Sequence, residues 1–267
     1  MNFLRVQRLG KNHGRYHGET NEVGSVLNQI ANAAENHGWT KELICETGGY
    51  PVLAWHRQAV VQPERPRRVY ISAGIHGDEP AGPLAVLSLL RQNRWPKTAE
   101  IFLLPCLNPV GFTLNLRGNA AGTDLNRDFR NPQTAECRAH VAWLERQPNF
   151  DCYFCVHEDW ESQGFYLYEQ NPDAHPSLAG EIIDSVMQVC PIDWSENIEG
   201  RRAQGGVIRP MINPQDRPDW PEALYLISHK SRMGYTLEAP SDFPLTTRID
   251  ALNTAMSTAL SLLTVHR

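Results

Sequence analysis

The sequence lacks an excess of positive charge. Its 267 residues include 25 Lys and Arg against 30 Asp and Glu, which gives a net charge of −5 at pH 7. Too few cations are left over to neutralise a phosphate backbone or an anionic lipid surface, so we expect neither nucleic acid nor a membrane as a partner. Long apolar runs are also missing. The longest one outside strand-like segments, at about Leu84–Leu90, contains a serine and falls far short of the roughly 20 residues that cross a bilayer.

Cysteine is scarce, and no signal peptide is apparent. The six cysteines are too few for a disulfide scaffold and fit a reducing compartment, where they serve as small apolar residues. The first residues, Met1–Arg8, show no apolar core of roughly 7–15 residues after a basic start. We therefore expect a cytoplasmic protein with free thiols at Cys45, Cys106, Cys137, Cys152, Cys155 and Cys190.

What is present is an ordinary globular composition, with 41% hydrophobic and 21% charged residues. Disordered, collagenous and low-complexity classes are excluded by these values. We expect one domain over residues 1–267, because α/β folds of this size often form a single unit and the sequence shows no linker or internal repeat.

Hydrophobic periodicity predicts strands that alternate with helices. The expected strands are Glu42–Thr47, Pro51–His56, Arg68–Ile75, Ile101–Leu107, Cys152–His157 and Tyr235–Ala239, with the first two in a hairpin. The expected helices are Val23–Ala34, capped by Thr20 or Asn21, and Leu84–Leu90, Thr134–Gln147, Leu178–Val189 and Leu245–Leu263. This order indicates the α/β class, as a single domain with a mixed, mostly parallel twisted sheet and helices on both faces.

The segment 191–222 breaks the pattern, because it combines Pro, Gly and Arg residues with neither period. We interpret it as a long loop that either borders the active site or forms a mobile surface insertion. Its arginines could make such a border basic and suit a substrate with more than one carboxylate, or they could face bulk water. These arginines are Arg201, Arg202, Arg209 and Arg217.

The sharpest local pattern is His76-x-x-Glu79, with glycines at positions 74 and 77 and Pro80 directly after it. The glycines permit a tight bend and the proline suits a helix start, so both side chains are expected at a strand-to-helix turn. An imidazole nitrogen and a carboxylate oxygen at this spacing can bind one cation such as Zn²⁺. Taken alone, the pair fits a loop salt bridge or a helix cap equally well.

A catalytic zinc site needs about three protein ligands and an open position. His157 is the best third candidate, because it ends a predicted strand and α/β sheets build their sites at the carboxyl ends of strands. The neighbouring Cys152-x-x-Cys155 is not expected to bind metal or to act in redox chemistry, because an extended strand points these two side chains to opposite faces.

Between these candidates lies a glycine-rich segment with two arginines. Arg127 follows Asn126 and offers a planar fork that suits a carboxylate, while Arg117 supplies a fixed charge that suits an oxyanion. Either arginine by itself could equally be a solvated surface residue.

The ordered set of motifs resembles the zinc carboxypeptidase family, whose pattern is His-x-x-Glu, an Arg, an Asn-Arg pair, a third His ligand and a late catalytic Glu. The matching residues are His76, Glu79, Arg117, Asn126, Arg127, His157 and Glu238. The similarity runs from about Arg68 to Pro240. Two segments, Asn-Pro-x-Gly-Phe at 108–112 and Asn-Ala-Ala-Gly-x-Asp-Leu-Asn-Arg at 119–127, are particularly similar to the bacterial branch near the murein peptide amidases.

This resemblance implies a zinc-dependent hydrolase of the metallocarboxypeptidase or murein peptide amidase type, which cleaves an amide bond next to a free carboxylate on a small peptide. The implied ligands of its one Zn²⁺ ion are His76, Glu79 and His157. Glu238 would act as general base and then as proton donor, and Arg117 would stabilise the oxyanion. Asn126 and Arg127 would bind the substrate carboxylate. Strand alternation agrees with the role of Glu238, because it turns this side chain away from its apolar neighbours.

Two features depart from the family pattern. The family usually carries a substrate-binding Tyr upstream of the catalytic Glu, and no residue here aligns well with it. Tyr225 is a guess that we leave outside the catalytic set. An acidic cluster, Glu158, Asp159 and Glu161, follows the third ligand. It could orient the ligands, bind a substrate amine, recruit a second cation or be a solvated loop.

A second hypothesis is an N-acyl amino acid deacylase, because succinylglutamate desuccinylase and aspartoacylase share a similar order of His-x-x-Glu, Asp-Leu-Asn-Arg and His. The segment Asn-Pro-Val-Gly-Phe favours the peptidase. A catalytically silent binding module is a third reading, which the retained ligands, base and arginines disfavour. The substrate is therefore expected to be a small peptide or an N-acyl amino acid, and the sequence does not indicate an oligomeric state.

Overall fold

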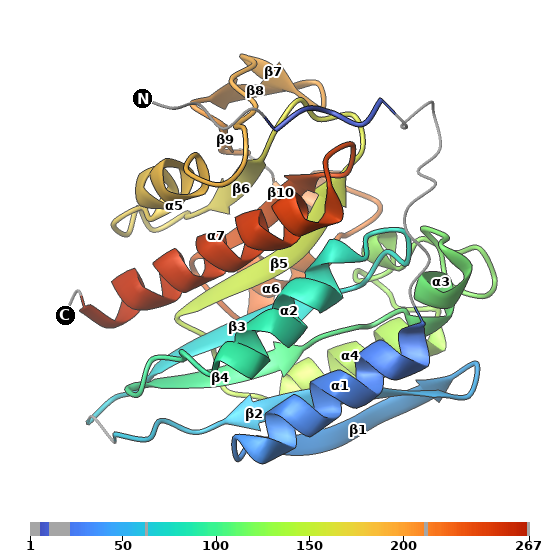
Figure 1. The fold of residues 1–267 in the computed structure, drawn as a ribbon. Helices are drawn as coiled ribbons and strands as arrows, with labels where there is room; N and C mark the ends of the chain where they lie inside the picture. The colour runs from blue at the N-terminus through green and yellow to red at the C-terminus, as the bar shows by residue number, and fades with distance from the viewer. Residues whose placement is uncertain (1–5, 11–21, 62–63, 211–212, 266–267) are drawn as a thin grey trace.

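The computed structural model describes residues 6–10, 22–61, 64–210 and 213–265, and its centre is a ten-stranded sheet (Figure 1). The strands are β1 (Thr40–Thr47), β2 (Tyr50–Arg57), β3 (Arg67–Ala73), β4 (Ala99–Leu104), β5 (Cys152–Asp159), β6 (Tyr166–Gln170), β7 (Asn197–Ile198), β8 (Arg201–Gln204), β9 (Val207–Ile208) and β10 (Gly234–Pro240). Across the sheet their order is β1-β2-β4-β3-β5-β10-β6-β9-β8-β7.

The sheet is mixed, and its centre is parallel. Strands β4, β3, β5 and β10 run parallel to one another, which places the carboxyl ends of β3, β5 and β10 side by side. Five of the nine strand pairings are antiparallel, namely those of the β1–β2 hairpin, β2 with β4, β6 with β10, β7 with β8, and β8 with β9. The expected mixed sheet is confirmed, whereas the mostly parallel arrangement holds only for the centre.

Helices cover both faces of the sheet, as predicted. The helices are α1 (Val23–Asn36), α2 (Ala81–Gln92), α3 (Pro109–Leu114), α4 (Ala135–Arg146), α5 (Ala179–Val186), α6 (Glu222–His229) and α7 (Leu245–Val265), with 3₁₀ turns η1 (Leu125–Arg127) and η2 (Pro214–Asp216). One apolar core lies between the sheet and α1, α2, α5 and α7, and a second lies between the sheet and α4 and α6 (Figure 1).

Local sequence signals account for the helix positions. In α1, Val23, Val26, Ile30 and Ala34 recur at helical spacing and are buried. The predicted caps Thr20 and Asn21 lie outside the described residues. At α4 the side chain of Thr134, the first residue of the predicted helix, accepts a hydrogen bond from the backbone N–H of Cys137 and so caps a helix that begins at Ala135.

The segment 191–222 is not the structureless loop that we expected. It contains β7, β8 and β9, which extend the sheet beyond β6, and then η2. Strands of two to four residues are too short to show a period of two, which is why the sequence pattern missed them. Two turns separate the strands, at Glu199-Gly200 and at Gly205-Gly206, and all four residues have positive φ.

The cysteine and membrane predictions can be compared with the fold. All six cysteines are free. Cys152 belongs to the first apolar core and Cys155 to the second, so the two thiols point to opposite faces of β5 as expected. No helix among the described residues has the length and hydropathy needed to span a bilayer.

Candidate active site

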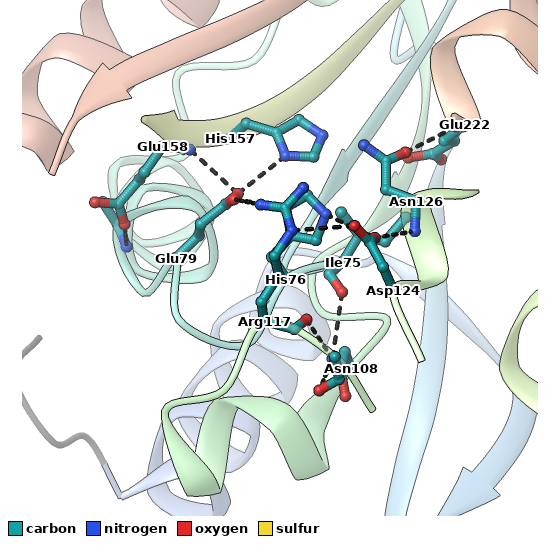
Figure 2. Close-up of polar contacts among 12 residues, drawn as sticks. Ile75, His76, Glu79, Asn108, Arg117, Asp124, Asn126, His157, Glu158 and Glu222 are labelled. Carbon is teal, nitrogen blue, oxygen red and sulfur yellow. Dashed lines mark hydrogen bonds and ion pairs between the residues drawn. The ribbon is translucent and has the colours of Figure 1, made fainter. Parts of the chain in front are cut away.

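The three predicted metal ligands lie together at the carboxyl ends of β3 and β5. His76, Glu79 and His157 are each at most 6% exposed, and one ligand atom from each lies within 4.8 Å of the other two. Within the described part of the chain, no other group of three His, Cys, Asp or Glu residues is so arranged. Glu79 connects the two rings: its Oε1 lies 2.5 Å from Nδ1 of His76, and its Oε2 lies 2.9 Å from Nδ1 of His157 (Figure 2).

The electrostatics of this group suit a cation. Burial acts to lower the pKa of His76, but the carboxylates of Glu79 and Asp124 outweigh it and raise this pKa to about 9. Burial acts to raise the pKa of Glu79, but His76 and His157 prevail and hold it far below its usual value. A cation that takes these ligand atoms therefore competes with a proton.

The turn that carries His76 is built by close backbone contacts. Gly74 has a φ of +62°, which a residue with a side chain rarely adopts. A Cβ on Gly77 would lie 1.9 Å from the carbonyl carbon of Gly111, so only glycine fits there. Asn108 joins the two segments, because its Nδ2 donates to the carbonyl oxygens of Ile75 and Gly118 at 3.3 and 3.0 Å, and its Oδ1 accepts from the N–H of Gly111.

Asp124 orients two of the predicted residues, a role that the sequence analysis missed. One of its carboxylate oxygens lies 3.2 Å from Nε2 of His76, and the other accepts a hydrogen bond from Nε of Arg117 at 3.0 Å (Figure 2). A carboxylate on the far nitrogen of a ligating His fixes the ring and raises its basicity. Its position two residues before Asn126, inside the Asp-Leu-Asn-Arg motif, is the signal that could have found it. The arginine is half-exposed, with Nη1 3.6 Å from Oε1 of Glu79.

Asn126 and Arg127 come from η1 and line the same pocket as the metal ligands, a cavity of about 330 Å³. The side-chain Oδ1 of Asn126 accepts a hydrogen bond from the backbone N–H of Glu222 at 2.9 Å, which turns the amide NH₂ group away from that contact (Figure 2). Sequence reasoning did not find Glu222. It is 1% exposed, and its carboxylate accepts from Ser72 Oγ at 2.7 Å and from the Tyr70 hydroxyl at 2.9 Å.

Glu238 lies beside His157, because these residues are register partners in β10 and β5. Its side chain and that of Thr236 line the pocket, while Tyr235, Leu237 and Ala239 are buried, as strand alternation predicted. Burial, and then the carboxylates of Glu79, Glu199 and Asp159, raise the pKa of Glu238 well above its usual value. The carboxylate forms no hydrogen bond or ion pair with another described residue.

The acidic cluster after His157 divides into two parts. The carboxylate of Glu158 is occupied by structural contacts. It accepts hydrogen bonds from Nη1 of Arg248 at 2.6 Å and from the backbone N–H of Ala81 at the start of α2. Both side chains of this ion pair are at most 1% exposed. Glu158, Asp159 and Glu161 all line the pocket, so Glu158 is set apart by its ion pair with Arg248 and not by its position.

Tyr225 lies away from the pocket that holds the metal ligands. It packs in the second apolar core, 4.9 Å between ring centres from His229, and does not line the pocket. The tyrosine that lines the pocket is Tyr168 on β6, whose hydroxyl donates to Glu199. Strand β6 has only five residues and was missing from the predicted strands, so its tyrosine was not considered.

Comparison with known proteins agrees with this geometry. Residues 65–147 match a family model described as the succinylglutamate desuccinylase/aspartoacylase catalytic domain. Murein peptide amidase A of Escherichia coli K12 is 42% identical over 73 residues, which are 27% of this chain and only 30% of that protein. A Shewanella amazonensis crystal structure classed as a metallopeptidase superposes with a TM-score of 0.78 at 25% identity, over 91% of this chain and 93% of that one. Together these matches support a relationship of this chain to the zinc carboxypeptidase-like family.

Other members of the zinc carboxypeptidase-like fold are more distant. A metallo-carboxypeptidase from Pseudomonas aeruginosa, solved in complex with (2-guanidinoethylmercapto)succinic acid, has a TM-score of 0.67 at 19% identity. The alignment covers 89% of this chain and 68% of that enzyme. At this identity the likeness concerns the fold alone.

Proposed function

We propose that this chain is a zinc-dependent hydrolase that cleaves an amide bond next to a free carboxylate on a small peptide. One observation carries the proposal: a single pocket is lined by the buried His76, Glu79 and His157 group, by the carboxylate of Glu238, and by Asn126 with the guanidinium of Arg127. Metal ligands, a proton acceptor and a carboxylate-binding pair thus face one small volume.

The donor set fits zinc. Two imidazole nitrogens and one carboxylate oxygen are a common ligand set of catalytic zinc, and three protein ligands leave a position open. His76, Glu79 and His157 would hold one ion, which when bound supplies a Lewis acid that polarises the scissile carbonyl and makes water more acidic. Asp124, 3.2 Å from Nε2 of His76, keeps Nδ1 of that ring turned toward Glu79.

Glu238 is the proposed general base. Its position beside His157 brings it to the metal ligands, and its carboxylate is not occupied by a hydrogen bond or ion pair with another described residue. It takes the proton of the attacking water and then donates it to the leaving amine. Arg117, held by Asp124, offers N–H groups to the oxyanion that develops on the carbonyl.

Asn126 and Arg127 are the proposed carboxylate site. The guanidinium of Arg127 can bind a carboxylate with two parallel hydrogen bonds, and the Asn126 amide adds a further donor. These contacts would hold the free carboxylate of the substrate in the pocket that Glu238 also lines, and would restrict cleavage to the amide next to it.

A substrate panel tests the proposal. We expect the zinc-loaded protein to release the last residue of a peptide with a free carboxyl terminus, and to spare the same peptide with a terminal amide. Replacing Arg127 by Gln should remove this discrimination, while Arg138→Gln on the exposed side of α4 should retain it. Equal cleavage of both peptides by the wild type would contradict the proposed carboxylate site.

An N-acyl amino acid deacylase is the second candidate, because the family model that matches residues 65–147 is that of desuccinylase and aspartoacylase catalytic domains. The panel therefore includes N-succinyl and N-acetyl amino acids, and a murein tripeptide because of the likeness to murein peptide amidase A. Turnover of the N-acyl amino acids without cleavage of any peptide would favour the deacylase.

The proposal includes a cytoplasmic location and a single zinc ion per chain. Six unpaired thiols support the location, since reducing compartments keep such thiols free. Cell fractionation with an antibody to the protein would measure it.

A further inference from the structure

The pocket has a basic side that the proposed catalytic residues do not use. Arg201, at the start of β8, and Arg217, directly after η2, are both half-buried and line the pocket together with Arg127. The three guanidiniums come from separate elements of the chain. They line one pocket because the parts of the chain that carry Arg201 and Arg217 border the carboxyl ends of the central strands.

These three arginines line one pocket, and the positive charges of two of them act on the third. Burial, and then the positive charges of Arg201 and Arg127, lower the pKa of Arg217. Within the described residues, none of the three forms an ion pair with a carboxylate. By contrast, Arg209 from the same segment pairs with Glu169 at 2.7 Å, and the exposed Arg202 does not line the pocket.

One carboxylate cannot use all of these donors. Its two oxygens offer about four acceptor positions, whereas each guanidinium carries five N–H donors. Arg127 and Asn126 already suffice for a single carboxylate. Glu199, in the turn before Arg201, also lines the pocket, but its carboxylate accepts from the Tyr168 hydroxyl.

We infer that Arg201 and Arg217 bind a second carboxylate of the substrate, so that the pocket selects compounds with two acidic groups. The inference rests on the proposed function in one respect only, since it takes Asn126 and Arg127 to hold the first carboxylate. The specificity is then set by the segment 191–222, whereas the metal ligands and Glu238 set the reaction.

Two peptides that differ only in one charge test this inference. Ala-Ala-Glu and Ala-Ala-Gln have nearly the same shape, and we expect wild-type kcat/KM to favour the first by about 10- to 100-fold, the effect of one or two charge-assisted hydrogen bonds. The double variant Arg201→Gln/Arg217→Gln should raise KM for Ala-Ala-Glu far more than for Ala-Ala-Gln. The preference of the wild type should shrink as salt is added, and Arg202→Gln should keep it.

A binding measurement separates this inference from the proposed function. Calorimetry with zinc-loaded Glu238→Gln compares the affinities of the two peptides without cleavage. A preference for Ala-Ala-Glu that the arginine substitutions remove would support the second carboxylate site even if no peptide is cleaved. Cleavage of both peptides with equal kcat/KM and equal affinity would overturn the inference while leaving the proposed function intact.

Discussion

Glu222 offers the most informative single perturbation, because its side chain touches no substrate in the proposed mechanism and yet its backbone holds Asn126. The carboxylate accepts hydrogen bonds from two buried hydroxyls, Ser72 Oγ at 2.7 Å and the Tyr70 hydroxyl at 2.9 Å. These contacts fix the first residue of α6. The N–H of that same residue donates to Oδ1 of Asn126 at 2.9 Å.

Replacing Glu222 by Ala should reduce both stability and substrate binding. The buried Ser72 hydroxyl loses its acceptor at a cost of about 1–3 kcal/mol, whereas the Tyr70 hydroxyl keeps Nε2 of His140 as a partner, so the free energy of unfolding should fall by about 1–3 kcal/mol. The start of α6 is then no longer anchored, and the Asn126 amide loses its fixed direction. Loss of this one donor to a carboxylate corresponds to roughly a tenfold higher KM, with kcat little changed.

Glu222→Gln is the matched control. Burial raises the pKa of Glu222, so the neutral amide is a close mimic of the carboxyl group. Gln keeps an acceptor for Ser72, and the Tyr70 hydroxyl has a second partner in Nε2 of His140 at 2.8 Å. We therefore expect Gln at this position to restore most of the stability and a KM near that of the wild type.

Urea unfolding and steady-state kinetics on a free-carboxylate peptide, both on zinc-loaded protein, measure these effects. The kinetic assays are carried out under conditions well below the unfolding midpoint of each protein. The lower stability of Glu222→Ala then does not alter the measured KM. An unchanged KM in Glu222→Ala, despite lower stability, would refute the argument that Glu222 positions Asn126.

Three further predictions concern other parts of the molecule. Gly77→Ala should weaken zinc binding by tenfold or more in a zinc titration, because the new Cβ would lie 1.9 Å from the Gly111 carbonyl carbon. The control Gly180→Ala should bind zinc normally, because no described atom lies within 4 Å of a Cβ at that position. Burial lowers the pKa of His140 to about 3, and among the described residues its polar contacts are with Tyr70 and Glu222. The unfolded chain therefore binds more protons than the folded one between pH 6.5 and 3. The free energy of unfolding should therefore fall as the pH falls through this window, by up to about 1.4 kcal/mol per pH unit. A difference in unfolding free energy between the wild type and His140→Asn that does not change with pH would contradict this prediction. Burial also raises the pKa of the thiols, to about 11 for the half-buried Cys45, so the native protein at pH 8 should react with iodoacetamide far more slowly than the urea-unfolded protein, which exposes all six.

Part of the fold follows from short-range sequence patterns. Residues of β3, β5 and β10 form apolar runs, and α4 begins directly after Thr134, so periodicity and capping locate these elements to within a few residues. Short strands are different. The strands β7 and β9 have two residues each, and their positions depend on pairing with neighbours that are distant in sequence.

The candidate site divides in the same way. His76 and Glu79 are three residues apart, so one turn can bring them together, and the resemblance then adds His157 and Glu238. Contacts between distant segments are not visible in the sequence: Glu222 is 96 residues from Asn126, and Glu158 is 90 residues from Arg248. For Glu158 the buried ion pair with Arg248 shows that this member of the acidic cluster is not part of a solvated loop.

The zinc content of three purified proteins, measured together with their turnover, tests the central claim most directly. We predict one zinc per chain in the wild type, little in His157→Ala, and one in Glu238→Gln. Turnover in Glu238→Gln should fall by about 10²- to 10⁴-fold, the usual contribution of a general acid and base. Zinc retained at full occupancy by His157→Ala, or normal turnover by Glu238→Gln, would contradict the account.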